Sequence, residues 1–282
     1  MNCMGSQNGS DYTPTLSLKE FSEKISSLGI KKANTKSWQL VLLGILAGIY
    51  ISLGGLGYLV ASGAGEGKLL ASVVFCSGLI MVVIAGAELF TGNIIMVVGT
   101  MSGLYSPLKL LKNWSLVYTA NFVASLAMVY LVWNGGLLGI EGELNHVGEV
   151  AVKVAHTKMS RTFTEYLIRG FFCNLLVIMA YIMATLAKDV ISKILCIIFP
   201  VALFVLCGFE HCVANMFLLP LGVIAEGGTL ADMPVLFSNI IPVTLGNILG
   251  GAFILVAHPN RIRQLSYLLG KRQVIKNDGD GA

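Results

Sequence analysis

The sequence predicts an all-α membrane protein of six transmembrane helices arranged as an inverted three-plus-three repeat, and three observations lead to this fold class. Hydrophobic residues make up 55% of the 282 positions, charged residues only 12%, and glycine occurs 32 times. This composition is typical of polytopic membrane proteins. Six apolar stretches are each long enough to cross a bilayer, for which a helix needs roughly 20 residues. Two of these stretches carry the same polar motif, G-x-E-x-x-x-x-N.

The six predicted spans follow the apolar stretches in order. The second and fifth are much longer than the roughly 20 residues that cross a bilayer, so we expect each of these two helices to be broken. Irregular backbone at that depth is tolerated only where it is buried in protein or lines a wet cavity. The predicted spans are Trp38 to Val60, Leu69 to Met101, Asn113 to Ile140, Tyr166 to Ala187, Ile194 to Ile224 and Pro234 to Ala257.

The first 37 residues are polar, and the apolar stretch after them is longer than a signal-peptide core, so no cleavable targeting signal is expected. A possible capping box at Ser17 precedes Leu18, Phe21, Ile25 and Leu28, which share one helical face. We expect a basic amphipathic helix on the cytoplasmic membrane surface, or alternatively a helix capping a pore mouth. The predicted organisation is an N-terminal cytoplasmic segment, 1–37, a six-span channel domain, 38–258, and a cytoplasmic tail, 259–282.

The basic residues between the spans predict the orientation. The N-terminal segment, the second-to-third connection, the fourth-to-fifth connection and the C-terminal tail are all basic, and six spans put them on one side. The positive-inside rule then places both termini in the cytoplasm. We expect a multi-pass protein of the cell (inner) membrane. The third-to-fourth connection is an exception, since Lys153, Lys158 and Arg161 lie on the outer side. Each half holds an odd number of spans, so the second half enters from the opposite side.

The repeated motif runs from Gly86 to Asn93 and again from Gly208 to Asn215. A carboxylate, an amide and a hydroxyl or imidazole are costly at mid-membrane depth, so an ion or solute pathway is the default explanation. Matching interruptions in two halves point to the binding region of an inverted-repeat transporter. A weaker match pairs Asn121 in the third span with Asn247 in the sixth. We expect the two breaks to face each other near the midplane.

Three segments resemble the hallmarks of one family. Phe90-Thr91-Gly92-Asn93, Arg169-Gly170-Phe171-Phe172-Cys173-Asn174 and the stretch G-F-E-H-C-V-A-N-M from Gly208 to Met216 follow one another in order. They are similar to the F-T-G-N, R-G-x-x-C-N and G-F-E-H-S-x-A-N-M motifs of the formate/nitrite transporter family. The resemblance runs from Trp38 to His258. The chain departs at Cys212, where serine is common, and this change conserves the size of the side chain.

This resemblance implies an aquaporin-like protomer, a homopentamer in the lipid bilayer, and one pore per protomer for small monovalent anions such as formate, nitrite or hydrosulfide. It implies a Thr91 hydroxyl at the break of the second helix, with His211 opposite as the single ionisable group facing the pore. Lys158 aligns with a basic residue at the outer vestibule. The implied substrate pathway comprises Thr91, His211, Lys158, Asn174, Glu210, Asn93 and Asn215, and the implied apolar constrictions comprise Phe75, Leu79, Phe90 and Phe204.

The chemistry of these residues suggests a mechanism. A bare anion that enters an apolar constriction loses its hydration at great cost, whereas its neutral conjugate acid loses far less. Histidine is the side chain whose unperturbed pKa lies near physiological pH. We therefore expect pH-dependent conduction through a transiently protonated weak acid, with protons as a second partner and His211 central. Glu88 and Glu210 are expected to build the breaks.

Other classes of protein fit less well. A proton-coupled symporter of the same anions stays open as an alternative. A neutral-solute channel is disfavoured because Asn-Pro-Ala is absent, and an intramembrane hydrolase because Gly-x-Ser-Gly is absent, so no enzyme activity is expected. Six cysteines without a C-x-x-C pair suggest neither a disulfide framework nor a metal site, and no cofactor or nucleic acid is expected. The remaining histidines, His146, His156 and His258, are expected in loops or at a span end, where they are solvated or interfacial.

Overall fold

The computed structural model describes residues 18–140 and 143–257, and these residues are mostly helical. The first half contains α1 (Leu18–Asn34), α2 (Ser37–Gly63), α3 (Lys68–Ala85), α4 (Phe90–Asn93), the 3-10 segment η1 (Ile94–Met96), α5 (Val97–Met101) and α6 (Pro107–Asn134). The second half contains β1 (Gly139–Ile140), β2 (Glu143–Leu144), α7 (His146–Met159), α8 (Phe163–Leu186), α9 (Val190–Leu206), α10 (Cys212–Ala225), η2 (Leu230–Leu236) and α11 (Phe237–Val256).

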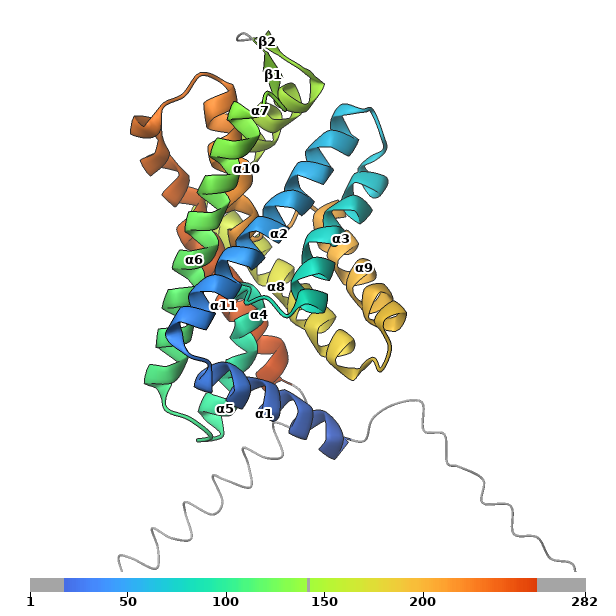
Figure 1. Ribbon diagram of the computed structural model, residues 1–282, viewed down its shortest axis with the longest axis vertical. Coiled ribbons are helices and arrows are strands. Elements are labelled where there is room, and N and C mark those ends of the chain that lie inside the picture. The colour runs from blue at the N-terminus through green and yellow to red at the C-terminus, as the bar shows by residue number, and fades with distance from the viewer. Residues whose placement is uncertain (1–17, 141–142, 258–282) are drawn as a thin grey trace, which may run out of the picture.

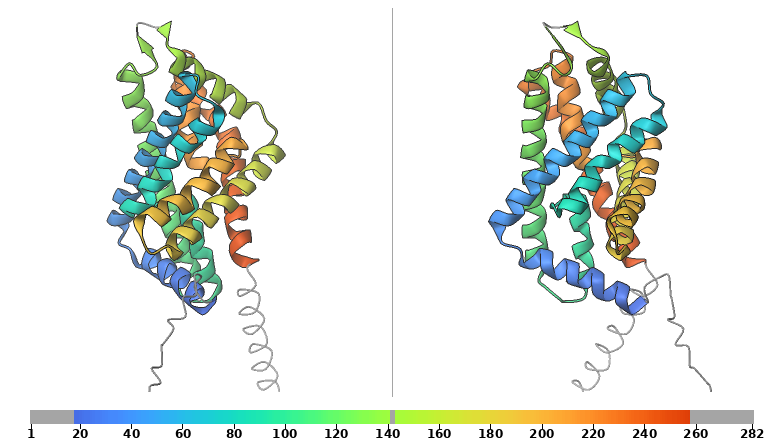
Figure 2. Two further views of the ribbon diagram at one scale, coloured as in Figure 1. Left: turned by 90° about the vertical axis from the view of Figure 1, so that its right-hand side faces the viewer. Right: turned by 45° about the vertical axis from the view of Figure 1, so that its right-hand side comes forward.

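The long helices form one bundle, and a shorter helix lies at each end of it (Figure 1). Helix α1 crosses one end, beside the turn between α5 and α6, whereas α7 and the antiparallel pair β1–β2 lie at the other end (Figure 2). The tightest pairings are α8 with α11, α2 with α3 and α2 with α6. Helix α1 contacts η1 and α5 at one end of the bundle, and helix α7 contacts α10 at the other end.

Within the described ranges, five helices are long and apolar enough to cross a membrane. Six spans were expected, and the missing one is the fifth, because the overlong second stretch still contributes α3. The second is divided among α3, α4, η1 and α5, and the fifth is divided between α9 and α10, neither of which reaches the length of a full crossing. The five helices are Ser37–Gly63, Lys68–Ala85, Pro107–Asn134, Phe163–Leu186 and Pro234–Val256.

The third predicted span was placed several residues too late. Helix α6 begins at Pro107 rather than Asn113, and it ends at Asn134 rather than Ile140. Proline is favoured at the first helical position because its missing N–H needs no partner there. Lys109 and Lys112 in the first turns lower the local hydropathy, so hydropathy alone places the boundary inside the helix.

The basic third connection contains helix α7, which the sequence reading treated as a loop. Ala151 and Ala155 of α7 are buried against α10, where a Cβ atom on Gly222 would lie only 2.3 Å from the Cβ of Ala155. His146 and His156 belong to this helix, so their placement in a loop was wrong, but both side chains are exposed, as expected. The other predicted solvated histidine, at position 258, lies outside the described residues.

Side-chain caps explain where several helices of the second half begin. Asn145 accepts hydrogen bonds from the backbone N–H groups of α7, and Thr162 with Glu165 forms a capping box at α8. Asp189 accepts a hydrogen bond from the Ser192 N–H at 2.8 Å, which lowers the pKa of the Asp189 carboxyl. Such caps satisfy N–H groups that a helix leaves unpaired at its first turn.

Helix α1 forms as the amphipathic pattern predicts, although its cap at Ser17 lies outside the described residues. The helix buries Ile25, which is 3% exposed, and also Lys32, which is 6% exposed. Gly29 lies against the ring of Tyr105, next to η1 and α5. One face of α1 is therefore covered by the end of the bundle, and its lysine side chain enters the protein interior.

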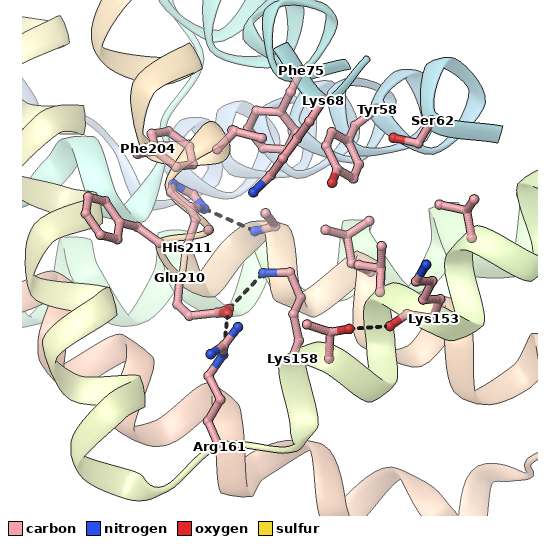
Figure 3. A pocket seen from close by; sticks show the side chains of 18 of the residues that line it. Tyr58, Ser62, Lys68, Phe75, Lys153, Lys158, Arg161, Phe204, Glu210 and His211 are labelled. Atoms are coloured by element: carbon pink, nitrogen blue, oxygen red, sulfur yellow. Dashed lines mark hydrogen bonds and ion pairs between the residues drawn. The ribbon is translucent and has the colours of Figure 1, made fainter. Parts of the chain in front are cut away.

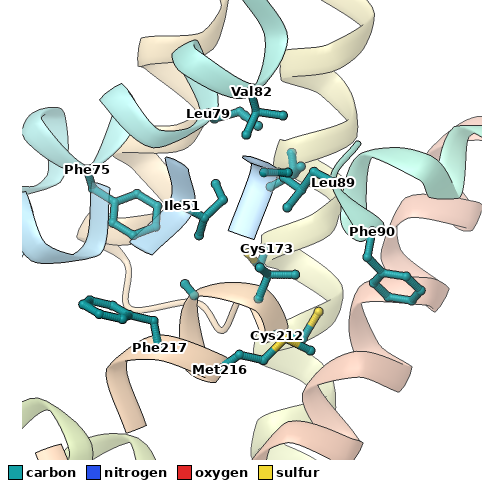
Figure 4. Packing of buried hydrophobic residues seen from close by; sticks show 14 of the residues in the cluster. Ile51, Phe75, Leu79, Val82, Leu89, Phe90, Cys173, Cys212, Met216 and Phe217 are labelled. Atoms are coloured by element: carbon teal, nitrogen blue, oxygen red, sulfur yellow. The ribbon is translucent and has the colours of Figure 1, made fainter. Parts of the chain in front are cut away.

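The apolar core lies among the long helices, and it includes residues beside Thr91 and His211 such as Phe90 and Cys212 (Figure 4). Ile51, Leu79 and Phe217 are almost completely buried there. Close backbone approach depends on glycine: a Cβ on Gly250 would lie 2.0 Å from the carbonyl oxygen of Phe171, where α11 meets α8. Small residues at such crossings allow helices to pack closely inside a membrane.

Candidate functional site

Two interruptions bring irregular backbone into the middle of the bundle. Helix α3 ends at Gly86, which has φ +71°, and no helix resumes until Phe90. Helix α9 ends before Gly208, which has φ +69°, and α10 starts after His211. Glycine tolerates positive φ because it lacks a Cβ atom. The N-terminal ends of α4 and α10 therefore lie inside the protein, where side chains must pair with several of their first N–H groups.

The first interruption is held by a buried polar cluster. Lys32 Nζ of α1 lies 2.9 Å from Glu88 Oε2, and the side chains are 7% and 10% exposed. Lys32 Nζ also donates to Asn93 Oδ1 at 2.8 Å, and Asn93 Nδ2 donates to both Glu88 Oε2 and Asn113 Oδ1. Asn113 Nδ2 donates to the Lys32 carbonyl. A buried ion pair is favourable only with such additional hydrogen bonds.

The second interruption has a cluster of the same design. Lys158 Nζ of α7 lies 2.8 Å from Glu210 Oε2, and Asn215 Nδ2 donates to Glu210 Oε2 and to Asn239 Oδ1, both at 2.8 Å. Asn239 Nδ2 donates to the Lys158 carbonyl. Arg161 adds a second cation, with its Nε 3.8 Å from Glu210 Oε1. Lys158 is thus already paired with a carboxylate.

The two clusters match position by position. Lys32 and Lys158 are 126 residues apart, as are Asn113 and Asn239, and Tyr118 and Thr244, whose hydroxyl groups meet at 3.0 Å. The motif residues are 122 apart, as are Cys76 and Ile198, which also contact each other. The correspondence therefore includes α1 and α7, which lie outside the spans from which the repeat was inferred.

A matching asparagine supports the backbone at each interruption. Asn121 donates to the carbonyls of Gly44 and Glu88 and accepts from the Phe90 N–H. Asn247 donates to the carbonyls of Gly170 and Glu210 and accepts from the Cys212 N–H. Both side chains are fully buried. Each amide thus satisfies three backbone groups that the interrupted helix leaves open, as buried backbone requires.

The two interruptions meet at Thr91 and His211. Thr91 Oγ1 lies 2.9 Å from His211 Nε2, and both side chains are buried. His211 Nδ1 accepts a hydrogen bond from the Ala214 N–H at 3.1 Å. In a neutral ring the proton must then be on Nε2, which donates to Thr91 Oγ1. The Thr91 hydroxyl hydrogen is left to donate to a further acceptor.

Asn174 of α8 lies beside this pair. Its Nδ2 donates to the carbonyls of Thr91 and Asn247, at 3.3 and 2.8 Å, and the side chain is fully buried. Its buried Oδ1 has no hydrogen-bond partner among the described residues. Thr91, His211 and Asn174 are therefore brought together, whereas Glu210 and Lys158 form the neighbouring cluster.

A cavity of about 500 Å³ leads to this pair from the α7 end of the bundle. Phe75, Phe204 and His211 lie at one end of it and Lys153 at the other (Figure 3). Its lining includes four basic and two acidic side chains, Lys68, Lys153, Lys158, Arg161, Glu66 and Glu210. The excess of positive charge favours anions.

The aromatic residues divide into two groups. Phe204 stacks on the His211 ring with centroids 6.0 Å apart, and Phe75 meets Phe204 edge-on at 5.8 Å. Leu79 is buried one turn along α3 from Phe75 (Figure 4). Phe90 is not brought to this group, because its ring packs on Tyr118 at 4.8 Å and on Trp114. Phe75 and Phe204 therefore border the cavity, and Phe90 faces α6.

The sequence reading missed several members of the site. Lys32, Asn113 and Asn239 were not identified, although the 126-residue spacing that relates Lys32 to Lys158 could have found them. No sequence pattern indicated a role for Lys68 in the site, since it directly precedes a predicted span and resembles an ordinary lysine at a span end. In the described part of the chain, no group of three or more histidine, cysteine, aspartate or glutamate residues is arranged to hold a metal ion.

The sequence matches known proteins over most of its length. Residues 19–260 match the family model described as "Formate/nitrite transporter". The chain is 33% identical over 273 residues to the formate channel FocA of Haemophilus influenzae, covering 88% of this chain and 95% of that protein. It is 34% identical over 250 residues to FocA of Escherichia coli K12, with 80% and 87% covered. A probable formate transporter of Methanothermobacter thermautotrophicus is 36% identical, with 80% and 89% covered.

Solved structures of similar fold also come from this family of channels. A structure described as a pentameric formate channel with formate bound matches with a TM-score of 0.67 and 32% identity, covering 82% of this chain and 98% of that one. A structure described as an FNT family ion channel matches with a TM-score of 0.74 and 27% identity, covering 84% and 96%.

Proposed function

Because this chain belongs to the formate/nitrite transporter family, we propose that it is a transmembrane channel for formate and related small monovalent weak-acid anions such as nitrite and hydrosulfide. Members of this family are transport proteins, so the prediction of a membrane transporter without enzyme activity is confirmed. The observation that carries the proposal is the Thr91–His211 hydrogen bond at the inner end of a basic cavity. Formate is the anion best supported by the relatives.

The proposed architecture is an inverted repeat whose second and fifth helices are broken, as in an aquaporin-like protomer. Residues 38–258 form the channel unit in this proposal. The matching Lys–Glu–Asn–Asn clusters support it, because their lysines come from α1 and α7, which lie at opposite ends of the bundle. The basic connections put α1 and both termini on the cytoplasmic side and α7 outside. We also propose a homopentamer in the bilayer, with the pentameric relative as its support.

Anions approach the proposed pore through the basic cavity. Glu210 balances part of the charge of Lys158 and Arg161, whereas Lys68 makes no ion pair with any described residue. Its ammonium group reaches toward the cavity from the start of α3 (Figure 3). An unpaired cation at the mouth of a narrow site raises the local concentration of anions. We assign the attraction to Lys68 together with Lys158.

The Thr91–His211 pair acts on the anion at the constriction. A buried environment disfavours the charged form of a weak acid, so the anion binds a proton more readily beyond Phe75 and Phe204. Addition of a proton to Nδ1 of His211 would break the hydrogen bond from the Ala214 N–H. We therefore propose that the hydrogen bond from His211 Nε2 orients Thr91, that the Thr91 hydroxyl donates to the anion, and that the anion takes its proton from water. Flux then rises as the pH on the donor side falls.

Replacement of His211 by phenylalanine tests this role. The variant keeps an apolar ring beside Phe204 and removes the hydrogen bond to Thr91. A hydrogen bond to an ion is worth about 1.5–3 kcal/mol, so we expect formate flux to fall by about tenfold or more and its pH dependence to change. The measurement is formate flux into proteoliposomes at several pH values, with Tyr130→Phe at an exposed position as the control. Full, selective flux with unchanged pH dependence would refute the role.

Single-channel recording on the same preparation separates a channel from proton symport. Resolvable unitary current steps are expected for the proposed channel. Saturable flux that collapses with the pH gradient would instead identify a symporter. Comparison of formate, nitrite, hydrosulfide, lactate and acetate flux defines the selectivity.

Neutralisation of Lys68 is expected to weaken the capture of anions. In Lys68→Gln, flux at low formate concentration should fall about three- to tenfold at low ionic strength, and the loss should shrink at high salt. The maximal flux should change little, because the Thr91–His211 pair is untouched. The control is Lys193→Gln in the first turn of α9, on the side opposite to the cavity mouth. Equal apparent KM values for the two variants would remove Lys68 from the mechanism.

A further inference from the structure

A second basic cavity lies at the α1 end of the bundle, away from the Thr91–His211 pair. It has a volume of about 450 Å³ and is formed by the end of α1, the start of α2 and the first turns of α6. The lysines among its lining residues are Lys32, Lys36, Lys109 and Lys112. Among the residues that the structure describes, no acidic side chain lines it. The cavity therefore concentrates positive charge without the carboxylate that balances the corresponding clusters at the interruptions.

Three of these lysines have charge available for a ligand. Lys32 is already paired with Glu88, but Lys36, Lys109 and Lys112 make no ion pair with any described residue. Lys109 Nζ is oriented by a hydrogen bond to Asn34 Oδ1 at 2.8 Å, which leaves its charge uncompensated. Helix α2 adds its first N–H groups, since Lys36 at its N-cap position supplies no side-chain cap. Unpaired N–H groups at the start of a helix favour anions.

The other half of the chain shows that the fold does not require these charges. The positions 126 residues after Lys36, Lys109 and Lys112 hold Thr162, Val235 and Ser238, none of them charged. Lysines at this end also obey the positive-inside rule, which alone would explain scattered basic residues. The rule does not explain their convergence on one cavity at the start of a helix.

We propose that this cavity binds a phosphate group, supplied either by the headgroup of an anionic phospholipid or by a soluble phosphate compound. Three ammonium groups and backbone N–H groups suit the several oxygens of a phosphate better than a small monovalent anion. The proposed orientation puts the cavity at the cytoplasmic leaflet, where anionic lipids attract basic residues. Because Lys32 and Asn113 form part of the wall, an occupant also stabilises the position of α1 against the first interruption. The inference goes beyond conduction and rests on the proposed function only for the leaflet.

The test measures binding rather than flux, so it stands even if the proposed conduction fails. The purified full chain in detergent is titrated with phosphatidylglycerol, phosphatidylcholine or inorganic phosphate. Retained lipid is measured by native mass spectrometry, and the midpoint of thermal unfolding is followed in parallel. We expect phosphatidylglycerol to be retained in preference to phosphatidylcholine and to raise the midpoint. An effect of inorganic phosphate without a lipid preference would support the site with a soluble ligand.

Matched variants assign any effect to the cavity. Lys109→Gln with Lys112→Gln should weaken binding by about 25-fold, since each lysine near a lipid surface contributes about fivefold. Lys188→Gln with Lys193→Gln removes the same charge at the same end of the bundle but outside the cavity, and it should leave binding unchanged. Lys36→Gln keeps the bond from Lys109 to Asn34 and serves if the double variant does not fold. Equal loss in both double variants, or no response to any probe, would overturn the proposal.

Discussion

Lys32→Met is expected to destabilise the protein by about 3–5 kcal/mol, because it removes one partner of a buried ion pair and leaves the other charge uncompensated. Lys32 and Glu88 lie 2.9 Å apart, with side chains 7% and 10% exposed. Methionine fills most of the space of the lysine chain, so a loss of packing does not account for the effect. The measurement is the free energy or the midpoint of unfolding of the purified protein in detergent.

Two comparisons isolate the charge. Lys31→Met changes the exposed neighbouring lysine and should stay within about 0.5 kcal/mol of the unsubstituted protein. Adding Glu88→Gln to Lys32→Met removes the orphaned charge while keeping an acceptor for Asn93, so part of the stability should return. If Lys32→Met and Lys31→Met behaved alike, α1 would not be held by the buried pair in the membrane.

Asn247→Leu is expected to be at least as damaging, since one side chain satisfies three buried backbone groups. The amide of Asn247 bonds the carbonyls of Gly170 and Glu210 and the N–H of Cys212. Each orphaned buried group costs about 1–3 kcal/mol, so the total reaches several kcal/mol, comparable with the stability of an ordinary domain. The yield of folded protein, by size-exclusion chromatography in detergent, should fall sharply, and any folded fraction should lose formate flux.

Asn134→Leu is the matched control for this change. Asn134 is exposed at the end of α6, and its side chain makes a bond to the carbonyl of Tyr130. The same substitution there should alter the yield little. Wild-type yield and flux in Asn247→Leu would mean that water or a repacked side chain satisfies the second interruption, and that the asparagine does not position His211.

The sequence predicted the site best where polar residues interrupt an apolar stretch, because such residues are costly in a membrane. The repeated Glu and Asn marked both interruptions, and the residues that differ between the copies, Thr91 and His211, lie 2.9 Å apart. Hydropathy detected α2, α8 and α11 nearly to their ends. It failed at α6 and α7, because lysines in the first turns of one helix and along the other resemble the composition of a loop.

The partners of the motif residues could not be read in the same way. Lys32 lies in a polar segment and looks like a lysine of a surface helix, yet its side chain is buried beside Glu88. Phe90 is adjacent to Thr91 in the chain, but its ring turns toward Tyr118 rather than toward Phe75. Side-chain direction at an irregular turn depends on the local backbone angles, which no periodic pattern determines.

By itself, the sequence determined that this chain crosses the membrane, where its helices are interrupted and which family it resembles. Those features follow from composition and from local spacing, since polar groups at membrane depth are costly wherever the chain places them. Only the tertiary structure decided that α1 and α7 supply the cations for the two carboxylates, that Asn121 and Asn247 hold the open backbone, and that lysines gather in two cavities. These contacts join segments far apart in the chain, and packing of the helices, rather than any local pattern, brings them together.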